Sequence, residues 1–287
     1  MNVFLQLCRR NLLLFFRDKS AVFFSLLSVF IIIGLYALFL GDVVVASVED
    51  VVGEHARFLI DSWIMAGTLA VTGITTTMGA FGILIDDQHR KYSNDFKSSP
   101  IKRGQILGAY IFSAWVIGVI VSLLGLLLAE VYIVFAGGRW LGFGSIMSMI
   151  GVMLVSVFSA NALILLVVSF FKSMRAFSVA STVVGSMIGF ITGIYIPVGQ
   201  LPPGVQTVVK LFPPSYSGSL YRLIMMEKPF ELANLPAAAV SEIKSVMGVT
   251  YSFGSSVVFP GASILILLVS GAVFFLVALL RFSRKNS

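Results

Sequence analysis

Long apolar runs separated by short polar segments dominate the sequence. Backbone groups in lipid must find their hydrogen bonds within the protein, so apolar runs of more than ~18 residues form membrane-spanning helices. The pattern therefore predicts an all-α membrane protein with six transmembrane helices in a single domain over residues 1–287. The six runs cover residues 21–40, 63–85, 106–136, 143–171, 176–196 and 262–281.

The third and fourth runs are longer than the ~20 residues that a helix needs to cross a bilayer. Their excess predicts a tilt, a break or an extension beyond the bilayer, and the sequence leaves these alternatives open.

Composition narrows the class of protein. Hydrophobic residues make up 58% of the chain and charged residues 11%, against ~25% charged in a soluble domain, which excludes a soluble enzyme. The basic residues fall in short clusters rather than on one broad face, which argues against nucleic-acid binding. The single cysteine, Cys8, excludes an intramolecular disulfide. No cluster has metal-ligand spacing and no Gly-x-Ser-x-Gly sequence holds a nucleophile, so we expect neither a metal nor a catalytic residue.

The positive charges favour one side of the membrane. Of the 20 Lys and Arg residues, 14 lie near the termini or in the loops that follow the second and fourth runs, and 6 lie in the alternate segments. The positive-inside rule places the richer side, with both termini, in the cytoplasm. The run at 21–40 exceeds the roughly 7–15 residues of a signal-peptide core, so an uncleaved anchor is favoured.

Residues 1–20 are predicted to form an interfacial helix before the first span. Apolar positions such as Leu7 and Phe15 alternate with polar ones over residues 3–16, a pattern typical of a helix in the cytoplasmic membrane interface. Asp18 and Lys19 then mark the turn into the first span. The alternative is a longer first helix that protrudes into the cytoplasm.

The most polar stretch, residues 86–105, is predicted to be a cytoplasmic loop. Pro100 stops a preceding helix, so a short helix at about 89–97 would display Tyr92 and Phe96 on one face. Such a face suits contact with a soluble partner, and the alternative is a solvated loop.

After the fifth run, the chain contains apolar pieces that are bracketed by prolines and are too short to cross the membrane. Residues 197–226 therefore predict an extracytoplasmic re-entrant helical hairpin, and residues 227–261 predict an outer segment.

Several stretches, taken in order, resemble the permease subunit of an ABC-2 type exporter over nearly the whole chain. They are the basic helix before the first span, residues 95–107 with Ser99 and Pro100, residues 193–202, residues 212–216, and Tyr221 with Arg222. Residues 86–90 depart from the family, which often has an acidic residue, Arg and Glu there.

The resemblance implies a permease without an ATPase of its own. The sequence agrees, because no Lys follows the glycines of a phosphate-binding loop. ATP and Mg would be bound by the partner, and this chain would carry no cofactor. The expected partners are two cytosolic ABC ATPase subunits, a second permease copy in a homodimer or related heterodimer, and the lipid of a bacterial cytoplasmic membrane.

The resemblance also implies that the loop at about 86–99 is a cytoplasmic coupling helix, with the N-terminal helix as a second contact. The residues expected to couple the permease to the ATPase are Arg9, Arg10, Arg90, Tyr92, Asp95 and Phe96.

Polar and small residues within the spans are candidates for the translocation path. Glu130, the only acidic residue deep in a span, either binds a cationic substrate or a proton, or reaches the outer headgroups or Arg139. Asn161 is either an interhelical hydrogen-bonding residue or a ligand, and the small residues of the second and fifth spans either pack or line a path between protomers. The candidates are Thr72, Thr76, Glu130, Asn161, Ser181 and Gly185.

The resemblance implies an exporter. Two sizeable outer segments, and spans without an aromatic series that would stack sugars, favour an amphipathic or hydrophobic substrate such as a drug, an antimicrobial peptide or a lipid-like molecule. The alternatives are a polysaccharide or teichoic-acid exporter and a membrane sensor or immunity scaffold that transports nothing.

Overall fold

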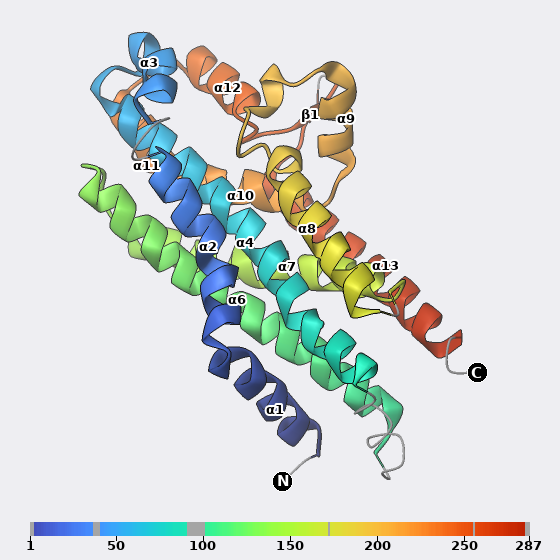
Figure 1. Ribbon diagram of the computed structural model, residues 1–287. Helices are drawn as coiled ribbons and strands as arrows, with labels where there is room; N and C mark the ends of the chain where they lie inside the picture. Colours follow the sequence, from blue (N-terminus) through green and yellow to red (C-terminus); the bar gives the residue numbers. More distant parts are fainter. Residues whose placement is uncertain (1–2, 37–40, 91–100, 172, 255, 285–287) are drawn as a thin grey trace.

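The computed structural model in Figure 1 describes residues 3–36, 41–90, 101–171, 173–254 and 256–284, which are almost entirely helical. In chain order the elements are α1 (Val3–Arg17), α2 (Lys19–Leu35), α3 (Gly41–Val52), η2 (Gly53–His55), α4 (Ala56–His89), α6 (Arg103–Phe135), α7 (Phe143–Val168), α8 (Met174–Ile191), η3 (Val198–Gln200), α9 (Pro203–Leu211), α10 (Ser215–Met225), α11 (Glu227–Ala233), α12 (Ala237–Val246), the antiparallel hairpin β1 (Ser252–Phe253) and β2 (Ser256–Val257), and α13 (Pro260–Arg284).

Five helical segments of the described chain are long and apolar enough to cross a membrane. They cover Val48–His89, Gly104–Phe135, Phe143–Val168, Met174–Ile191 and Pro260–Ser283. These segments contain α4, α6, α7, α8 and α13 and correspond to the second through sixth predicted spans, so the all-helical membrane class is confirmed.

The predicted first span, 21–40, corresponds only in part to a helix. Helix α2 has 17 residues and ends at Leu35, and residues 37–40 lie outside the described chain. A helix of that length rises about 26 Å, less than the ~30 Å of a hydrocarbon core. The structure thus supports about five spans where the sequence predicts six.

The over-long third run forms one continuous helix. Helix α6 has 33 residues and is therefore about 50 Å long at 1.5 Å per residue. A break is excluded, and this helix must tilt or extend beyond the bilayer. The fourth run is shorter than predicted, because α7 ends at Val168 rather than at residue 171.

The N-terminal helix and the first apolar helix are separate, as predicted. Helix α1 ends at Arg17, and the Asp18 side chain accepts a hydrogen bond from the backbone N–H of Ala21, which caps the N-terminus of α2. A single protruding first helix is therefore wrong. Leu7 and Cys8 bury one side of α1 against Ala109 of α6.

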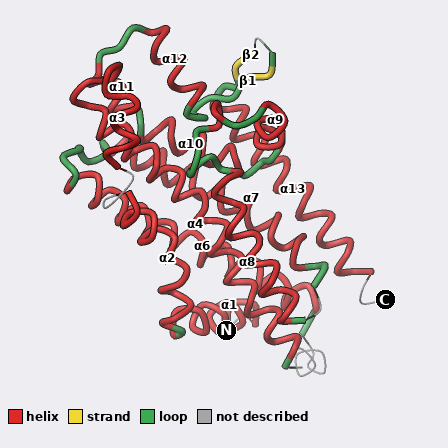
Figure 2. Tube along the Cα trace, turned by 45° about the horizontal axis from the view of Figure 1, so that its top comes forward, coloured by secondary structure: helices red, strands yellow, loops and turns green. Residues whose placement is uncertain are grey.

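Helix α4 forms the centre of the bundle. Most of its side chains are buried, and it packs against α2, α6, α7, α8 and α10. Helices α8 and α13 lie at the periphery and leave many apolar side chains exposed, as expected for helices that face lipid. The two termini lie at one end of the bundle, and α3, α9, α11, α12 and the β1–β2 hairpin gather at the opposite end (Figures 1 and 2).

The predicted re-entrant segment contains two short helices. Pro213 and Pro214 separate α9 from α10. Helix α9 is largely exposed, whereas α10 is buried against α4, α7 and α13. Re-entry into the membrane stays a prediction.

Candidate functional site

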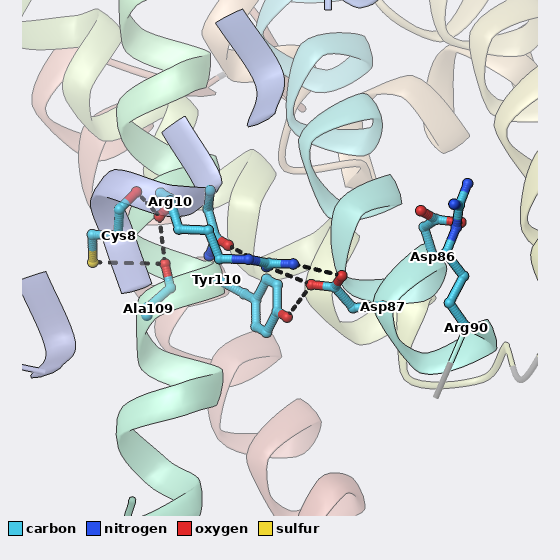
Figure 3. Close-up of polar contacts among 9 residues, drawn as sticks. Cys8, Arg10, Asp86, Asp87, Arg90, Ala109 and Tyr110 are labelled. Atoms are coloured by element: carbon cyan, nitrogen blue, oxygen red, sulfur yellow. Dashed lines mark hydrogen bonds and ion pairs between the residues drawn. The ribbon is translucent and has the colours of Figure 1, made fainter. Parts of the chain in front are cut away.

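Three helices meet at the Asp87 carboxylate near the end that carries the termini. The Arg10 guanidinium of α1 donates two hydrogen bonds, from Nη1 to Oδ2 at 2.6 Å and from Nη2 to Oδ1 at 2.8 Å. The Tyr110 hydroxyl of α6 donates a further hydrogen bond to Oδ2. Figure 3 shows both side chains pointing at Asp87 of α4. We call these three residues the Asp87 cluster.

In the Asp87 cluster, a buried carboxylate forms a bidentate ion pair with a guanidinium. The Asp87 side chain is 5% exposed and that of Arg10 is 32% exposed. The hydrogen bonds and charge of Asp87 raise the pKa of Arg10 above its usual range, so the guanidinium stays protonated at neutral pH. Parallel N–H···O bonds between guanidinium and carboxylate fix both distance and orientation.

A second contact holds α1 on α6 beside this cluster. The Ser113 hydroxyl donates to the backbone carbonyl of Ala109 at 2.7 Å and lies 3.4 Å from that of Cys8, and the Cys8 thiol faces the same Ala109 carbonyl. Burial raises the pKa of the Cys8 thiol. Helix α1 is therefore fixed to α4 and α6, the two helices that flank residues 90–102.

In both α1 and α4, two adjacent charged residues point in opposite directions. Asp86 pairs with Arg90 at 3.0 Å on the exposed side of α4, whereas Asp87 faces α1 (Figure 3). Arg9 is exposed and Arg10 is turned inward. Asp87 follows the buried Leu84 by three residues, and Arg10 follows the buried Leu7 by three. This helical spacing is the signal that could have assigned the pair from sequence.

The structure separates the predicted coupling residues into three groups. Arg9 and Arg90 are on the surface, Arg10 belongs to the Asp87 cluster, and Tyr92, Asp95 and Phe96 lie outside the described residues. The predicted helix at 89–97 begins where α4 ends at His89, and the rest of it lies outside the described chain.

The predicted path residues do not share one surface. Thr72 and Thr76 of α4 and Asn161 of α7 are buried inside the chain. Asn161 donates to the Ile111 carbonyl of α6 at 2.9 Å, so its predicted interhelical hydrogen bond is confirmed. Ser181 and Gly185 lie on peripheral α8, where no neighbouring atom lies within 4 Å of the position that a Cβ of Gly185 would take.

Several buried hydroxyls near the middle of the bundle have no protein partner. Buried polar groups need hydrogen bonds, so these atoms are suited to bind water or a polar group of a passing substrate. Within the described part of the chain they are Thr76 Oγ1, Ser122 Oγ and Ser159 Oγ.

Glu130 lies near the end of α6 that is opposite the termini, and it is 4% exposed. Its Oε2 accepts a hydrogen bond from the backbone N–H of Leu141 at 2.9 Å. No ion pair to Arg139 forms among the described residues, so the predicted pairing of these two side chains is wrong.

Arg222 of α10 is a buried cation that sequence reasoning noted only as part of a family motif. Its side chain is fully buried and has no carboxylate partner among the described residues. Nη2 donates to the backbone carbonyls of Thr192 at 2.9 Å and Gly193 at 2.8 Å, and Nη1 lies 3.5 Å from that of Gly248. The guanidinium lies 5.1 Å from the ring centre of Trp63.

The partners of Arg222 stand where two helices end. Thr192 and Gly193 follow α8, and Gly248 follows α12, so their carbonyls carry the partial negative charge of helix C-termini. Gly193 and Gly248 have φ of +67° and +65°, which L side chains rarely adopt. Arg222 thereby joins α4, α8, α10 and α12.

No curated protein matches the chain. The family model described as ABC-2 type transporter matches residues 2–226, a stretch that includes the Asp87 cluster, Glu130 and Arg222.

Proposed function

The chain belongs to the ABC-2 type transporter family, and on that premise we propose that it exports an amphipathic or hydrophobic substrate. It is a multi-pass membrane permease without an ATPase domain, and permeases of this family work with ABC ATPase partners. In our proposal two cytosolic ATPase subunits bind ATP and Mg and drive a pair of permease copies in a bacterial cytoplasmic membrane. The preferred cargo is a drug, an antimicrobial peptide or a lipid-like molecule.

The Asp87 cluster is the observation that carries the coupling part of this proposal. It fixes α1 to the ends of α4 and α6, between which residues 90–102 lie. A force applied to that loop or to exposed Arg9 therefore moves three helices as one body. Packed helices respond to such a force by rigid-body motion between discrete arrangements.

The proposed topology has six spans with both termini in the cytoplasm. The apolar run at residues 21–40, which contains most of α2, is the proposed first span, and an even number of crossings then places both ends of the chain on the side that carries 14 of the 20 cations.

The proposed translocation path uses residues from different parts of the bundle. Ser181 and Gly185 are half-buried on the peripheral helix α8, where a second permease copy can approach them. Thr72, Thr76 and Asn161 lie inside one protomer, close to unsatisfied hydroxyls, and Glu130 lies near the outer end. Small residues on α8 permit close approach of a partner helix.

Coupling is tested by co-expressing the permease with ABC ATPase subunits of the same organism. We expect the two proteins to co-purify and the double substitution Tyr92→Ala, Phe96→Ala to weaken their binding at least tenfold, since aromatic residues carry much of the energy of protein interfaces. Phe259→Ala, an exposed phenylalanine at the opposite end, is the matched control. Unchanged binding and ATP-dependent transport in the double variant would contradict the assignment of the loop.

The cargo class is tested with inside-out vesicles that contain the permease and its ATPase. We expect ATP-dependent uptake of rhodamine 6G, an amphipathic fluorescent cation. Uptake of a lipid-linked polysaccharide alone would favour the polysaccharide or teichoic-acid exporter, and ATP turnover without any transport would favour the sensor or immunity scaffold.

Orientation is tested by cysteine labelling. Cys8 is buried and is the only cysteine in the chain, so the unmodified protein should resist a membrane-impermeant maleimide. Glu242→Cys on α12 should react in intact cells, and Ser283→Cys near the end of α13 should react only after lysis. The reverse pattern would overturn the proposed topology.

A further inference from the structure

A cavity of about 360 Å³ opens at the end of the bundle opposite the termini. It lies where the first turns of α4 and α7, the last turns of α6 and the junction of α10 with α11 meet. Ligand pockets in proteins span roughly 300–1,000 Å³, so this cavity has room for a small polar group and part of its apolar carrier.

The cavity contains a buried carboxylate without a cation. Glu130 is 4% exposed, and its one hydrogen bond is the 2.9 Å contact from the Leu141 N–H to Oε2. Among the described residues no Lys, Arg or His forms an ion pair with it, although Arg139 lines the same cavity. A buried charge of this kind is costly unless it is paired, and Oε1 is available to accept a hydrogen bond from a donor outside the protein.

Ser62 supplies a second polar group without a partner. Ser62 lines the same cavity, and its buried hydroxyl has no hydrogen-bond partner among the residues that the structure describes. A donor with more than one N–H could bond both Glu130 and Ser62, and an ammonium group offers such donors in a compact form.

The walls of the cavity suit a cation that carries an apolar chain. Phe58 and Trp140 contribute aromatic rings, and Trp140 is 55% exposed, which places it on the open side. Aromatic faces attract cations and cover apolar chains. At the rim, Lys228 pairs with Glu231 at 2.8 Å.

The charges of the cavity also favour a cation. The Lys228–Glu231 pair is internally neutral, so the remaining lining charges are the carboxylates of Glu130 and Glu227 against the guanidinium of Arg139. The lining is therefore net negative.

We propose that the cavity bounded by Glu130, Ser62, Phe58 and Trp140 binds the ammonium group of an amphipathic amine. The ammonium donates to the Glu130 carboxylate and the Ser62 hydroxyl, while the carbon chain lies against the aromatic rings. The amine comes either from the ethanolamine headgroup of a membrane lipid or from exported cargo. Only the cargo source rests on the proposed export function.

The proposal is tested by isothermal titration of the purified permease in maltoside micelles, without any ATPase. The probe is 2-phenylethylammonium, and the neutral 2-phenylethanol has nearly the same shape. We expect the alcohol to bind at least tenfold more weakly. Glu130→Gln, whose amide oxygen still accepts from Leu141, should weaken binding of the amine at least tenfold, since a charge-assisted hydrogen bond becomes a neutral one.

Two controls separate binding from folding. Glu242→Gln changes an exposed glutamate outside the cavity and should bind the amine as the unmodified protein does. The thermal midpoint of Glu130→Gln should match that of the unmodified protein. Equal affinity of Glu130→Gln and the unmodified protein for the amine, or equal affinity for the amine and the alcohol, would overturn the proposal.

The source of the amine is identified by native mass spectrometry from nanodiscs with equal amounts of phosphatidylethanolamine and phosphatidylglycerol. Selective retention of phosphatidylethanolamine that Glu130→Gln abolishes assigns the site to lipid. Binding of 2-phenylethylammonium without such retention assigns it to cargo. Failure of export with intact amine binding would refute the proposed function and leave the cavity assignment standing.

Discussion

Two arginines at opposite ends of the bundle, one half-buried and one fully buried, are neutralised in different ways. Arg10 meets the carboxylate of Asp87 and remains about one-third exposed. Arg222 is fully buried and meets backbone carbonyls at the C-termini of α8 and α12 instead of an acid. One arginine thus joins helices through an ion pair, and the other joins them through the main chain.

The difference indicates which end of the molecule can rearrange. Separating Arg10 from Asp87 leaves a guanidinium that water can solvate, because the Arg10 side chain is already 32% exposed. Moving Arg222 would leave a buried guanidinium without acceptors, and it would leave the carbonyls after α8 and α12 without their hydrogen-bond donor. In low-dielectric surroundings both changes cost much free energy. The end with the termini is suited to transmit motion, and the opposite end is suited to remain rigid.

The largest expected effect comes from Arg222→Met, which keeps an apolar stem but removes every donor. The carbonyls of Thr192 and Gly193 lose their partner, and each orphaned group costs ~1–3 kcal/mol, so we expect a loss of about 3 kcal/mol or more. The measurement is the thermal midpoint in detergent together with the yield of folded protein.

The control for this substitution is Arg139→Met, which changes an exposed arginine at the same end. Its effect on stability should stay within ~0.5 kcal/mol. Equal midpoints for the two variants would show that Arg222 does not hold α8, α10 and α12 together.

An intermediate effect is expected for Asp87→Asn. Arg10 then loses its counter-ion, which in a fully buried pair costs ~3–5 kcal/mol. Because Arg10 is partly solvated, we expect ~1–3 kcal/mol. ATP hydrolysis should persist while transport by the complex with the ATPase falls, since α1 no longer moves with α4.

Asp86→Asn provides the matched control, because its carboxylate pairs with Arg90 on the exposed side. It should change the midpoint by less than ~0.5 kcal/mol. If Asp86→Asn impaired transport as much as Asp87→Asn did, the inward ion pair would not be the coupling element.

The smallest effect is expected for Tyr110→Phe. It removes one of the hydrogen bonds to Asp87 and leaves the two from Arg10, so we expect a loss of ~1 kcal/mol and a modest decrease in transport. Thermal unfolding of Tyr110→Phe is compared with that of Tyr195→Phe, whose ring is 43% exposed. A larger loss of stability for Tyr195→Phe than for Tyr110→Phe would show that the Tyr110 hydroxyl does not stabilise the Asp87 cluster.

Hydrophobic pattern and capping chemistry predicted much of the fold. The apolar runs gave the five long helices, because a bilayer requires helices of that length. Asp18 marked the junction of α1 and α2, because its side chain caps the second helix. The order of proline-containing motifs identified the family, which the match over residues 2–226 confirms.

The candidate site was less predictable, because its contacts join residues far apart in the chain. Arg10 and Asp87 are separated by 77 positions, and the donors of Arg222 face carbonyls 26 to 30 positions away. Charge counting placed Arg10 among the cations of the cytoplasmic side, and it could reveal neither its pairing with Asp87 nor that backbone carbonyls neutralise Arg222. The Glu130 contact to Leu141 likewise depends on how the α6–α7 connection folds back.

The sequence by itself determined that the chain is a helical membrane permease that depends on a separate ATPase, since apolar length, charge placement and motif order are local properties. Only the tertiary structure decided that α1 is fixed to α4 and α6 through Asp87, that Arg222 is held by helix ends, and that Glu130 lies unpaired in a cavity. The physical reason is that each of these depends on which helix faces lie against one another, and packing of the whole bundle sets that geometry.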